Sequence, residues 1–348
     1  MAINFRRLRV GAVAPPAIES LIPHAPFGYA NQGSTPVTGG SSIISVTNMA
    51  DLKDNLQTPG KTVIVMADIT NTSTTGQNYG IFNPASDVTL VSAPGVTLRG
   101  FGIFWQTDGS PKNNIMVRNC VFRDMPNFAA VGLSDRDYIS LKNGQKRVYI
   151  EHCDFYSEAG EGVDGFLDTT NGCDFVTIAH CKFANDSKAS LVGLRDPNTD
   201  PNQLRVTYAY NWFLNNLERQ PKYGATTGHC FNNFCEQTIT RVGYQGYAMG
   251  VSAGAILRID NNVFKDFTGE PLKTLEEFAI DGTMKYGYFS GINTNSFINC
   301  GANDFNGQVE SNWLPPYAYD NILLPTSAVE AYVKANAGQT RTLAQMGY

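Results

Sequence analysis

The sequence predicts an all-β protein: a right-handed, single-stranded parallel β-helix with short helical caps at both ends. Three observations predict this class. A short apolar phrase recurs along the chain, its intervals match the turn of a solenoid, and no helical periodicity separates the repeats. The composition agrees, because 33 glycines and only 16% charged residues among 348 fit short strands joined by many turns.

The repeated phrase alternates apolar residues and ends on a polar residue followed by an aromatic one. It reads NIMVRNCVF, RVYIEHCDF, FVTIAHCKF, RVTYAYNWF and ILRIDNNVF, and we expect one strand from each. Aligned phrases share a position occupied by Cys120, Cys153, Cys181, Asn211, Asn233 and Asn262. Two residues later stand Phe122, Phe155, Phe183, Phe213 and Phe264. Stacked turns would make both positions internal ladders, with Asn bonded to backbone at a bend and Cys as a small apolar substitute.

A β-sandwich is the alternative fold for a chain of many short strands. Its strands recur about every 8 to 12 residues and are joined by tight hairpins. Only Asn143-Gly144 and Asn171-Gly172 offer such turns here. We therefore predict a single domain over residues 27–348, including a C-terminal wrapping segment, after an extension over residues 1–26.

Two helices are expected outside the repeats. Residues Met49 to Leu56 form an amphipathic stretch that could close the open end of the solenoid. The segment from Pro325 to Gly338 has a start signal, a helical stripe and a stop signal, and we expect it to pack on the outside.

Charge and cysteine content restrict the possible partners. A net charge of −5 argues against a nucleic-acid-binding surface, so an anionic ligand must be met by local cations or a metal.

Seven cysteines without CxxC pairs indicate reduced structural thiols. No apolar run reaches the ~18 residues of a membrane helix, and GAVAPPAI is too short and too proline-rich for a signal peptide. We expect a monomer without nucleic-acid or membrane partners.

Four aspartates fall on two neighbouring turns of the predicted solenoid. Asp135 and Asp137 are two residues apart, and Asp164 and Asp168 are four apart, so each pair projects to one face of an extended chain. The solenoid period would bring the pairs together. Clustered carboxylates need a cation, and an oxygen-rich, Cys-free cluster suits Ca²⁺ rather than zinc. A single exposed aspartate would instead be interpreted as a solvated turn residue.

Basic residues follow on the next turns of the predicted solenoid. They are Lys188, Arg195, Arg219 and Lys222. Isolated surface cations usually pair with neighbouring acids. Cations on successive turns beside an acidic cluster indicate instead an anionic substrate that bridges both.

The order of these segments resembles the calcium-dependent pectate lyases, in the polysaccharide lyase superfamily that also contains pectin lyases. The resemblance spans nearly the whole chain and is carried by Asp-x-Asp, VYIEHCDF, Asp164-x-x-x-Asp168, VTIAHCKF, Lys188, RVTYAYNWF, Arg219-x-Pro221 and GHCFNN. FGYANQGSTPVTGG and LLPTSAVEAYVKANAG resemble the opening and closing segments of the family.

The resemblance implies a role for each matching position. The implied calcium ligands are Asp135, Asp137, Asp164 and Asp168. The implied catalytic residues are Arg219, as the base, and Lys188, which would also bind a substrate uronate carboxylate. Substrate contacts are further expected from Lys222 and Arg195. His152 and His229 resemble buried histidines of the family, and we expect both to be core side chains of rung strands.

The implied reaction is calcium-dependent β-elimination on de-esterified polygalacturonate, giving unsaturated oligogalacturonides. Removing the proton α to a uronate carboxylate leaves an anion that Ca²⁺ and Lys188 would stabilise. An Arg base is unusual because guanidinium normally stays protonated, so neighbouring cations and alkaline pH would have to favour its neutral form. The family phrase R-x-P-R-x-R is shortened here to RQPKYGA, with Lys222 in place of an arginine fork.

Three alternatives share the predicted solenoid. A polygalacturonan hydrolase is one, and NTD at Asn198 to Asp200 is similar to one of its motifs, but the sequence contains no Asp-Asp pair for inverting hydrolysis. A second is a particle-displayed or secreted depolymerase lyase acting on another uronate-containing exopolysaccharide. A third, an inactive adhesion solenoid, would not require Lys188 and Arg219 beside four aspartates. We expect an extracellular enzyme, or a virion-associated one under the second alternative.

Overall fold

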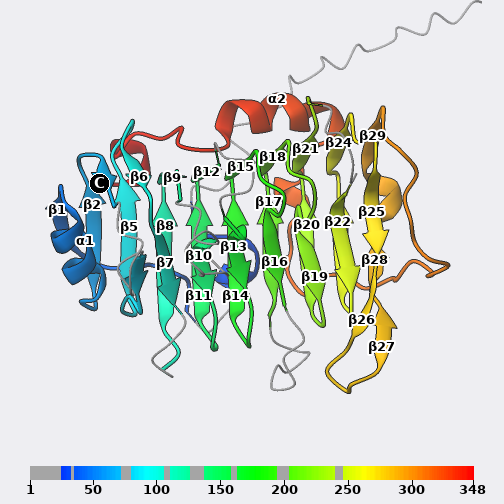
Figure 1. Ribbon diagram of the computed structural model, residues 1–348, viewed down its shortest axis with the longest axis horizontal. Coiled ribbons are helices and arrows are strands. Elements are labelled where there is room, and N and C mark those ends of the chain that lie inside the picture. Colours follow the sequence, from blue (N-terminus) through cyan, green and yellow to red (C-terminus); the bar gives the residue numbers. More distant parts are fainter. Residues whose placement is uncertain are drawn as a thin grey trace, which may run out of the picture.

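The computed structural model describes residues 25–32, 35–71, 80–105, 110–125, 137–157, 163–193, 204–239 and 246–348. In this part of the chain, three sheets run the length of an elongated solenoid, and each turn adds one strand to each sheet (Figure 1). Strand pairing is parallel except where one hairpin joins the last described turns. The predicted right-handed parallel β-helix is confirmed.

Through the middle of the solenoid, the strands of each sheet follow one another in chain order and are three apart in number; the spacing differs at the ends. Sheet A contains β1 (Ser42–Val46), β2 (Lys61–Val65), β5 (Val88–Ser92), β8 (Asn113–Arg118), β11 (Lys146–Glu151), β14 (Asp174–Ala179), β17 (Val206–Ala209), β20 (Thr227–Phe231), β23 (Ile256–Asp260) and β28 (Tyr288–Ser290). Sheet B contains β3 (Ile69–Thr70), β6 (Thr97–Arg99), β9 (Val121–Arg123), β12 (Asp154–Tyr156), β15 (Lys182–Ala184), β18 (Trp212–Leu214), β21 (Phe234–Glu236), β24 (Val263–Lys265) and β29 (Ser296–Ile298). Sheet C contains β4 (Gly80–Phe82), β7 (Gly102–Trp105), β10 (Asp137–Leu141), β13 (Gly165–Thr169), β16 (Ser190–Val192), β19 (Lys222–Gly224), β22 (Tyr247–Ser252), β25 (Glu270–Thr274) and the hairpin β26 (Glu276–Phe278) and β27 (Met284–Tyr286).

Each repeated phrase forms two strands, so the prediction of one strand per phrase is wrong. NIMVRNCVF gives β8 and β9, which are separated by Asn119 and Cys120. Asn119 has a φ of 55°, in the left-handed region. The same backbone conformation recurs on the later turns at His152, His180, Tyr210, Asn232 and Asn261. This residue turns the chain from sheet A into sheet B, and the apolar alternation continues across the bend, which is why the pattern reads as a single strand.

The residue after each bend forms the predicted internal ladder. The Asn211 amide donates to Asn233 Oδ1 at 2.9 Å, and the Asn233 amide donates to Asn262 Oδ1 at 2.9 Å. Each of these amides also donates to a backbone carbonyl of the preceding turn. The earlier turns have cysteine at this position, and all seven cysteines of the chain are free thiols, as predicted. Buried amides are thus satisfied by their own copies one turn away.

The predicted phenylalanine ladder also forms, with one interruption. Phe122 stacks on Phe155 with ring centroids 5.3 Å apart, and the stack continues through Phe183 to Phe213. Cys235 then occupies the ladder position in β21. Parallel, offset rings retain favourable aromatic packing while following the strand spacing.

The helices lie where the sequence places them. The first helix, α1, spans Met49–Leu56 and buries Leu52 and Leu56 against the first turns, which closes this end of the core. The second, α2, spans Thr326–Asn336, two residues short of Gly338, and packs outside the solenoid on β21 and β24 (Figure 1). Among the described residues, neither helix has the length and apolar character needed to cross a membrane.

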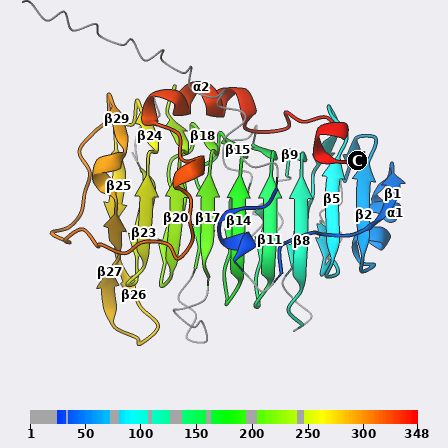
Figure 2. The same ribbon diagram turned by 180° about the vertical axis from the view of Figure 1, so that it is seen from behind.

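Segments from both ends of the domain cross the outside of the solenoid. Figure 2 shows the N-terminal segment, in blue, and an orange segment before α2 lying across sheet A. Phe27 and Tyr319 pack there in an apolar layer outside the sheet. Beyond α2, the tail binds the first turns: Gln339 donates to the Asn119 carbonyl at 2.8 Å, and Arg118 donates to the Tyr348 hydroxyl at 3.1 Å.

His152 contacts this tail. It lies at the bend after β11, so its predicted place in a strand is wrong, although it is buried as expected. Its ring stacks on His180 with centroids 4.7 Å apart, and its Nδ1 lies 3.1 Å from the Thr340 hydroxyl. Burial, followed by the nearby charge of Arg341, lowers the pKa of His152 to about 3.

Replacing His152 by Asn should flatten the dependence of stability on pH. The pKa of His152 is about 3 when folded and ~6.5 when unfolded. The unfolded chain therefore binds more protons in this window, and stability is lost as pH falls through it, by up to ~1.4 kcal/mol per pH unit. Asn fits the left-handed bend, as Asn119 and Asn232 show. Denaturant unfolding from pH 7 to pH 4 measures the slope; an unchanged slope in the variant would contradict the assignment.

Candidate active site on sheet C

Charged side chains gather on the outer face of sheet C. The register places Asp168 of β13 beside Ser140 of β10 on one side and Leu191 of β16 on the other. Leu191 in turn pairs with Lys222 of β19. The neighbouring row, with Leu167, points into the core. Asp168 and Lys222 therefore share one outward row, two strand spacings or ~10 Å apart.

Two carboxylates flank a position that has no side chain. Gly165 opens β13, and a Cβ placed on it would lie 3.3 Å from Asp137 Oδ1 and 3.4 Å from Asp168 Oδ1. Asp137 itself is the Cα partner of Gly165 across the pair β10 and β13. Glycine thus leaves open a space bordered by two carboxylate oxygens, which are ligands that Ca²⁺ prefers.

Asp168 lies in an environment that disfavours its negative charge. Burial raises the pKa of its carboxyl to about 6, and the charge of Asp164 acts in the same direction. The Leu191 N–H, which donates to Asp168 Oδ1 at 3.0 Å, and the charges of Lys142 and Arg219 offset this only in part. A bound cation would supply the missing compensation.

The basic side chains of the site, Lys188 and Arg219, lie on the next two turns. Lys188 Nζ lies 2.9 Å from Asp164 Oδ1, and both side chains remain more than one-third exposed. Lys188 forms a parallel bridge with Glu218, which places Arg219 beside it on the following turn. Arg219 Nε lies 3.4 Å from Glu218 Oε1, and the Arg219 backbone has a φ of 61°.

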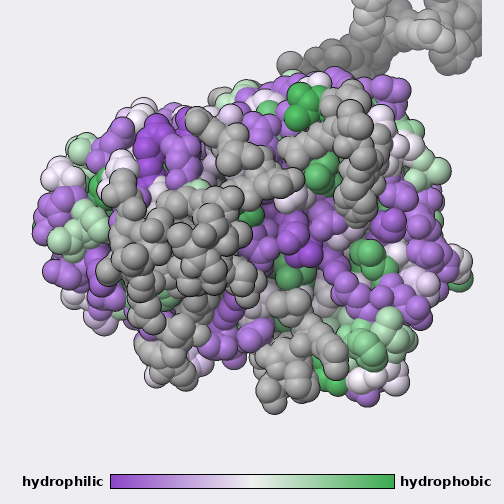
Figure 3. Space-filling view, in the orientation of Figure 1, coloured by the Kyte–Doolittle hydropathy of each residue, from purple (hydrophilic) through white to green (hydrophobic). Residues whose placement is uncertain are grey.

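Lys222 already has an anionic partner. Its ammonium forms an ion pair with Glu277 of the hairpin β26–β27, whose other carboxylate oxygen accepts from Ser252 at 2.8 Å. The Lys222 side chain is 9% exposed, whereas that of Glu277 is 46% exposed. In Figure 3, hydrophobic surface gathers at the lower right, where this hairpin projects. Its two strands each carry an exposed apolar side chain, Phe278 on β26 and Met284 on β27.

Six of the eight predicted site residues lie in the described part of the chain. The structure brings five of them to successive turns along one face: Asp137, Asp168, Lys188, Arg219 and Lys222. Asp164 joins them through Lys188. Asp135 and Arg195 lie outside the described residues, as do Asn198 to Asp200. Within the described ranges, no three acidic, histidine or cysteine side chains are assembled around a metal position. The four-aspartate calcium site stays a prediction.

Three further residues at the site were not anticipated. Glu218 precedes Arg219 directly, so its position in the chain was a usable signal. Gly165 could have been noticed between Asp164 and Asp168, but nothing in the sequence shows which oxygens face it. Glu277 is 55 residues from Lys222, and only the hairpin brings the two together.

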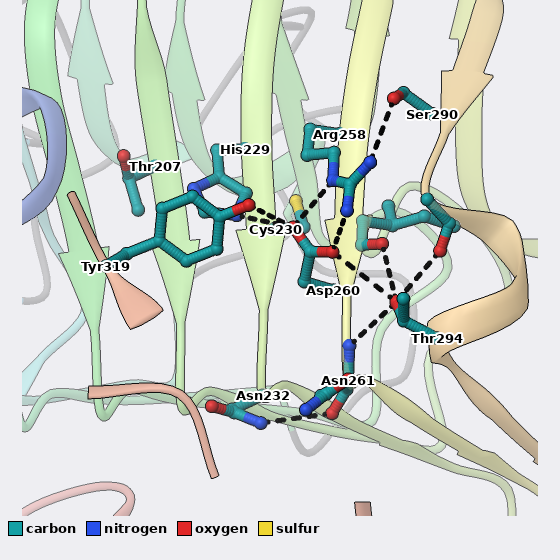
Figure 4. Close-up of polar contacts among 12 residues, drawn as sticks. Thr207, His229, Cys230, Asn232, Arg258, Asp260, Asn261, Ser290, Thr294 and Tyr319 are labelled. Atoms are coloured by element: carbon teal, nitrogen blue, oxygen red, sulfur yellow. Dashed lines mark hydrogen bonds and ion pairs between the residues drawn. The ribbon is translucent and has the colours of Figure 1, made fainter. Parts of the chain in front are cut away.

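A second cluster of titratable side chains lies on the outer face of sheet A (Figure 4). His229 Nε2 is 3.2 Å from Asp260 Oδ2, Arg258 Nε donates to the same oxygen at 2.7 Å, and the Tyr319 hydroxyl donates to it at 2.9 Å. Burial raises the pKa of Asp260, but hydrogen bonds from His229 and Arg258 outweigh it and lower the value to about 2. His229 is fully buried. This cluster attaches the covering segment to the turns, as expected for a structural histidine.

Comparison with known proteins identifies the family of this chain. The sequence profile of the family described as pectate lyase matches residues 17–342. This chain belongs to the pectate lyase family. It is therefore a polysaccharide lyase. A pectate trisaccharide-lyase from Bacillus licheniformis is 27% identical over 323 residues, which cover 90% of this chain and 85% of the relative. Pectate lyase A from Aspergillus niger is 28% identical over 252 residues, covering 70% and 67%.

Solved structures of family members show the same fold. A pectate lyase from Acidovorax avenae subsp. citrulli matches with a TM-score of 0.72 at 17% identity, covering 98% of this chain and 99% of that one. A pectate lyase from Bacillus sp. N165, solved in complex with trigalacturonate, matches with a TM-score of 0.70 at 22% identity, covering 90% and 98%.

Replacing Asp260 by Asn should destabilise the protein without changing turnover by the folded molecules. The substitution removes one partner of a buried ionic network, and such losses cost about 3 to 5 kcal/mol. Unfolding by denaturant gives the stability, and lyase activity per folded molecule gives turnover. Asp281→Asn is the control, because Asp281 forms an exposed ion pair with Lys285. Loss of turnover in a folded Asp260→Asn variant would show that the cluster takes part in catalysis.

Proposed function

We propose that this chain is a calcium-dependent pectate lyase, which cleaves de-esterified polygalacturonate by β-elimination and releases unsaturated oligogalacturonides. The observation that carries the proposal is the pair of carboxylates, Asp137 and Asp168, around the side-chain-free Gly165, with Lys188 and Arg219 on the next turns. The names of the relatives support it, since one is a pectate trisaccharide-lyase, and so does the trigalacturonate bound to a structural neighbour.

The acidic side chains would hold the calcium ion. Asp137 and Asp168 border the open position above Gly165, and Asp164 and Asp135 complete the proposed ligand set. When bound, Ca²⁺ would bind a uronate carboxylate and withdraw charge from it as the α-carbon loses its proton.

Lys188 and Arg219 would act on the substrate. Lys188 is already close to a carboxylate, that of Asp164, at 2.9 Å, so a uronate carboxylate in the same place would find a cationic partner. Arg219 in its neutral form would remove the proton α to that carboxylate. The C–H electron pair then forms the new C=C bond, the C–O bond to the leaving sugar breaks, and the leaving oxygen takes up a proton. Since guanidinium is normally protonated, alkaline pH should favour the reaction.

The remaining properties follow from this assignment. Lys222 would contribute a substrate contact that Glu277 weakens, and Arg195 a further contact. We infer that a monomer acts outside the cell, where pectic polymers occur.

The decisive test is incubation with polygalacturonate, with calcium or with a chelator, while the ultraviolet absorbance of the unsaturated product is followed. We expect a calcium-dependent rise. New reducing ends without absorbance would show hydrolysis instead. Inertness toward pectate, with activity on another uronate-containing exopolysaccharide, would show a depolymerase.

Arg219→Ala should lower kcat at least about a hundredfold and leave the fold intact, because removal of a general base costs ~10²- to 10⁴-fold. Arg99→Ala is a matched control, since Arg99 also pairs with a carboxylate, that of Asp124, but from sheet B. Circular dichroism reports on folding. A folded Arg219→Ala enzyme that retains most activity would exclude the base role.

Glu277→Gln should lower KM for polygalacturonate about two- to fivefold. The substitution removes the carboxylate that neutralises Lys222, and a partly exposed ion pair is worth ~0.5 to 1 kcal/mol. The freed ammonium would then bind a uronate carboxylate. Glu276→Gln is the control, because Glu276 is exposed on the same strand. If Glu277→Gln and Glu276→Gln have equal KM values, Lys222 does not bind the substrate.

A further inference from the structure

A positively charged pocket lies where sheet C turns into sheet A, apart from the candidate active site. It encloses about 380 Å³ and is lined by Pro111, Lys112, Asn113, Lys146, Arg147 and Phe175. Gly144 completes the wall, where a Cβ would lie 3.3 Å from the Pro111 ring. In Figure 1 these turns form the lower edge of the solenoid. The lining residues come from three consecutive turns, at the starts of β8, β11 and β14.

The pocket concentrates positive charge in a protein whose net charge is −5. Lys112, Lys146 and Arg147 all line it. The Arg147 guanidinium donates to neutral oxygens, namely Asn113 Oδ1 at 2.6 Å and the Thr35 carbonyl at 3.3 Å, with a further bond to the Thr35 hydroxyl. These bonds hold the guanidinium in place without cancelling its charge.

The acidic residues closest in register are engaged elsewhere. Asp174 is the Cα partner of Lys146, but its carboxylate accepts from Arg205 Nε at 2.9 Å and from the Arg205 N–H at 3.1 Å. Its side chain is 2% exposed. Asp87, one turn earlier, accepts from the Asn114 amide at 2.7 Å. Among the described residues, the two carboxylates in register with the pocket, those of Asp174 and Asp87, therefore point to other partners.

An aromatic ring lies beside these cations. Phe175 is half-buried, and the Arg205 guanidinium lies 4.0 Å from its ring centroid, which fixes the ring. Phe175 and Arg147 have φ values of 55° and 54°. Asn114 occupies the same register position one turn earlier, and Asn adopts this conformation at less cost. The bend accepts Asn and does not require Phe or Arg.

The pocket is connected to the active-site strands. Lys142 directly follows β10, and its charge acts on Asp168. The Gln145 side chain donates to the Lys142 carbonyl at 2.5 Å and accepts from the Lys112 N–H at 2.6 Å. The Gln145 side chain therefore joins the residue after β10 to the pocket wall at Lys112.

We propose that this pocket is a second binding site for the acidic polysaccharide, which holds a stretch of oligogalacturonate outside the catalytic site. Uronate carboxylates would pair with Lys146 and Arg147, and the apolar face of a sugar ring would lie on Phe175. The inference rests on the proposed function for the identity of the ligand. It predicts that long chains, but not short ones, gain affinity from the pocket.

The test compares Lys146→Gln/Arg147→Asn with a control, Lys53→Gln/Lys61→Gln, which removes the same charge from the N-terminal end of the solenoid. Asn suits the left-handed backbone at residue 147, as Asn114 shows. Native gel electrophoresis with polygalacturonate and a chelator measures binding without turnover. Initial rates on polygalacturonate and on trigalacturonate, with calcium, measure the contribution to catalysis.

We expect the pocket variant to bind polygalacturonate about fivefold more weakly or worse, to lose a similar factor in kcat/KM on the polymer, and to keep its rate on trigalacturonate. Phe175→Asn should act in the same direction and replaces the double variant if that one fails to fold. The proposal would be overturned if the control variant lost as much binding as the pocket variant, or if the pocket variant lost as much rate on trigalacturonate as on polygalacturonate. It would also be overturned if polygalacturonate did not retard the wild type in the gel. If polygalacturonate retards the wild type in the gel but no unsaturated product forms, the proposed reaction is refuted and the binding pocket remains supported.

Discussion

The left-handed bend after the sheet A strands from β8 to β23 is the constraint on which the rest of the structure depends. It sets where sheet B begins, so the Asn and Cys ladder and the phenylalanine ladder can form one turn above another. The shared register then extends to sheet C, where Asp168 and Leu191 are partners. Because side chains alternate along a strand, a slip of one residue would turn Asp168 into the core and Leu167 out of it.

Two aspartates show how this scaffold separates structure from chemistry: Asp260 is buried, whereas Asp168 is half-buried. Asp260 accepts hydrogen bonds from His229 and Arg258 under a covering segment, and its pKa lies at about 2. Loss of solvent also disfavours the negative charge of Asp168. Its neighbours offset this cost less fully, and the pKa of Asp168 is raised to about 6. The first carboxylate is satisfied by the protein alone. The second is compensated only in part by its neighbours, and a bound cation is our proposal for the remainder.

Much of this arrangement could be predicted from local sequence. The ladders were visible because the positions of Asn211 and Phe213 recur on successive turns, with cysteine in place of Asn on the earlier ones, and α1 was visible from its amphipathic pattern. Periodicity could not reveal the bend within each phrase, because alternation survives it. His152 was accordingly placed in a strand.

The site was predictable where its residues follow the solenoid period and not where they depart from it. Asp168, Lys188 and Arg219 lie on successive turns, so their proximity follows from the repeat. Glu277 comes from a hairpin that runs antiparallel to β22, outside the repeat. Its contact with Lys222 depends on how that hairpin folds back, which no local pattern encodes. The effect of Gly165 depends on the directions of two neighbouring carboxylates.

The tail after α2 has a consequence for how the chain can be made. Gln339 hydrogen-bonds the carbonyl of Asn119, a residue 220 positions earlier, and Tyr348 contacts Arg118. A ribosome that has finished the first turns must therefore add most of the domain before their outer surface can be covered. Meanwhile the early turns have their strand pairing, α1 and their internal ladders, but not this outer cover. Assembly can thus proceed in the order of synthesis, while the cover over the first turns forms only after residues 339–348 have been made.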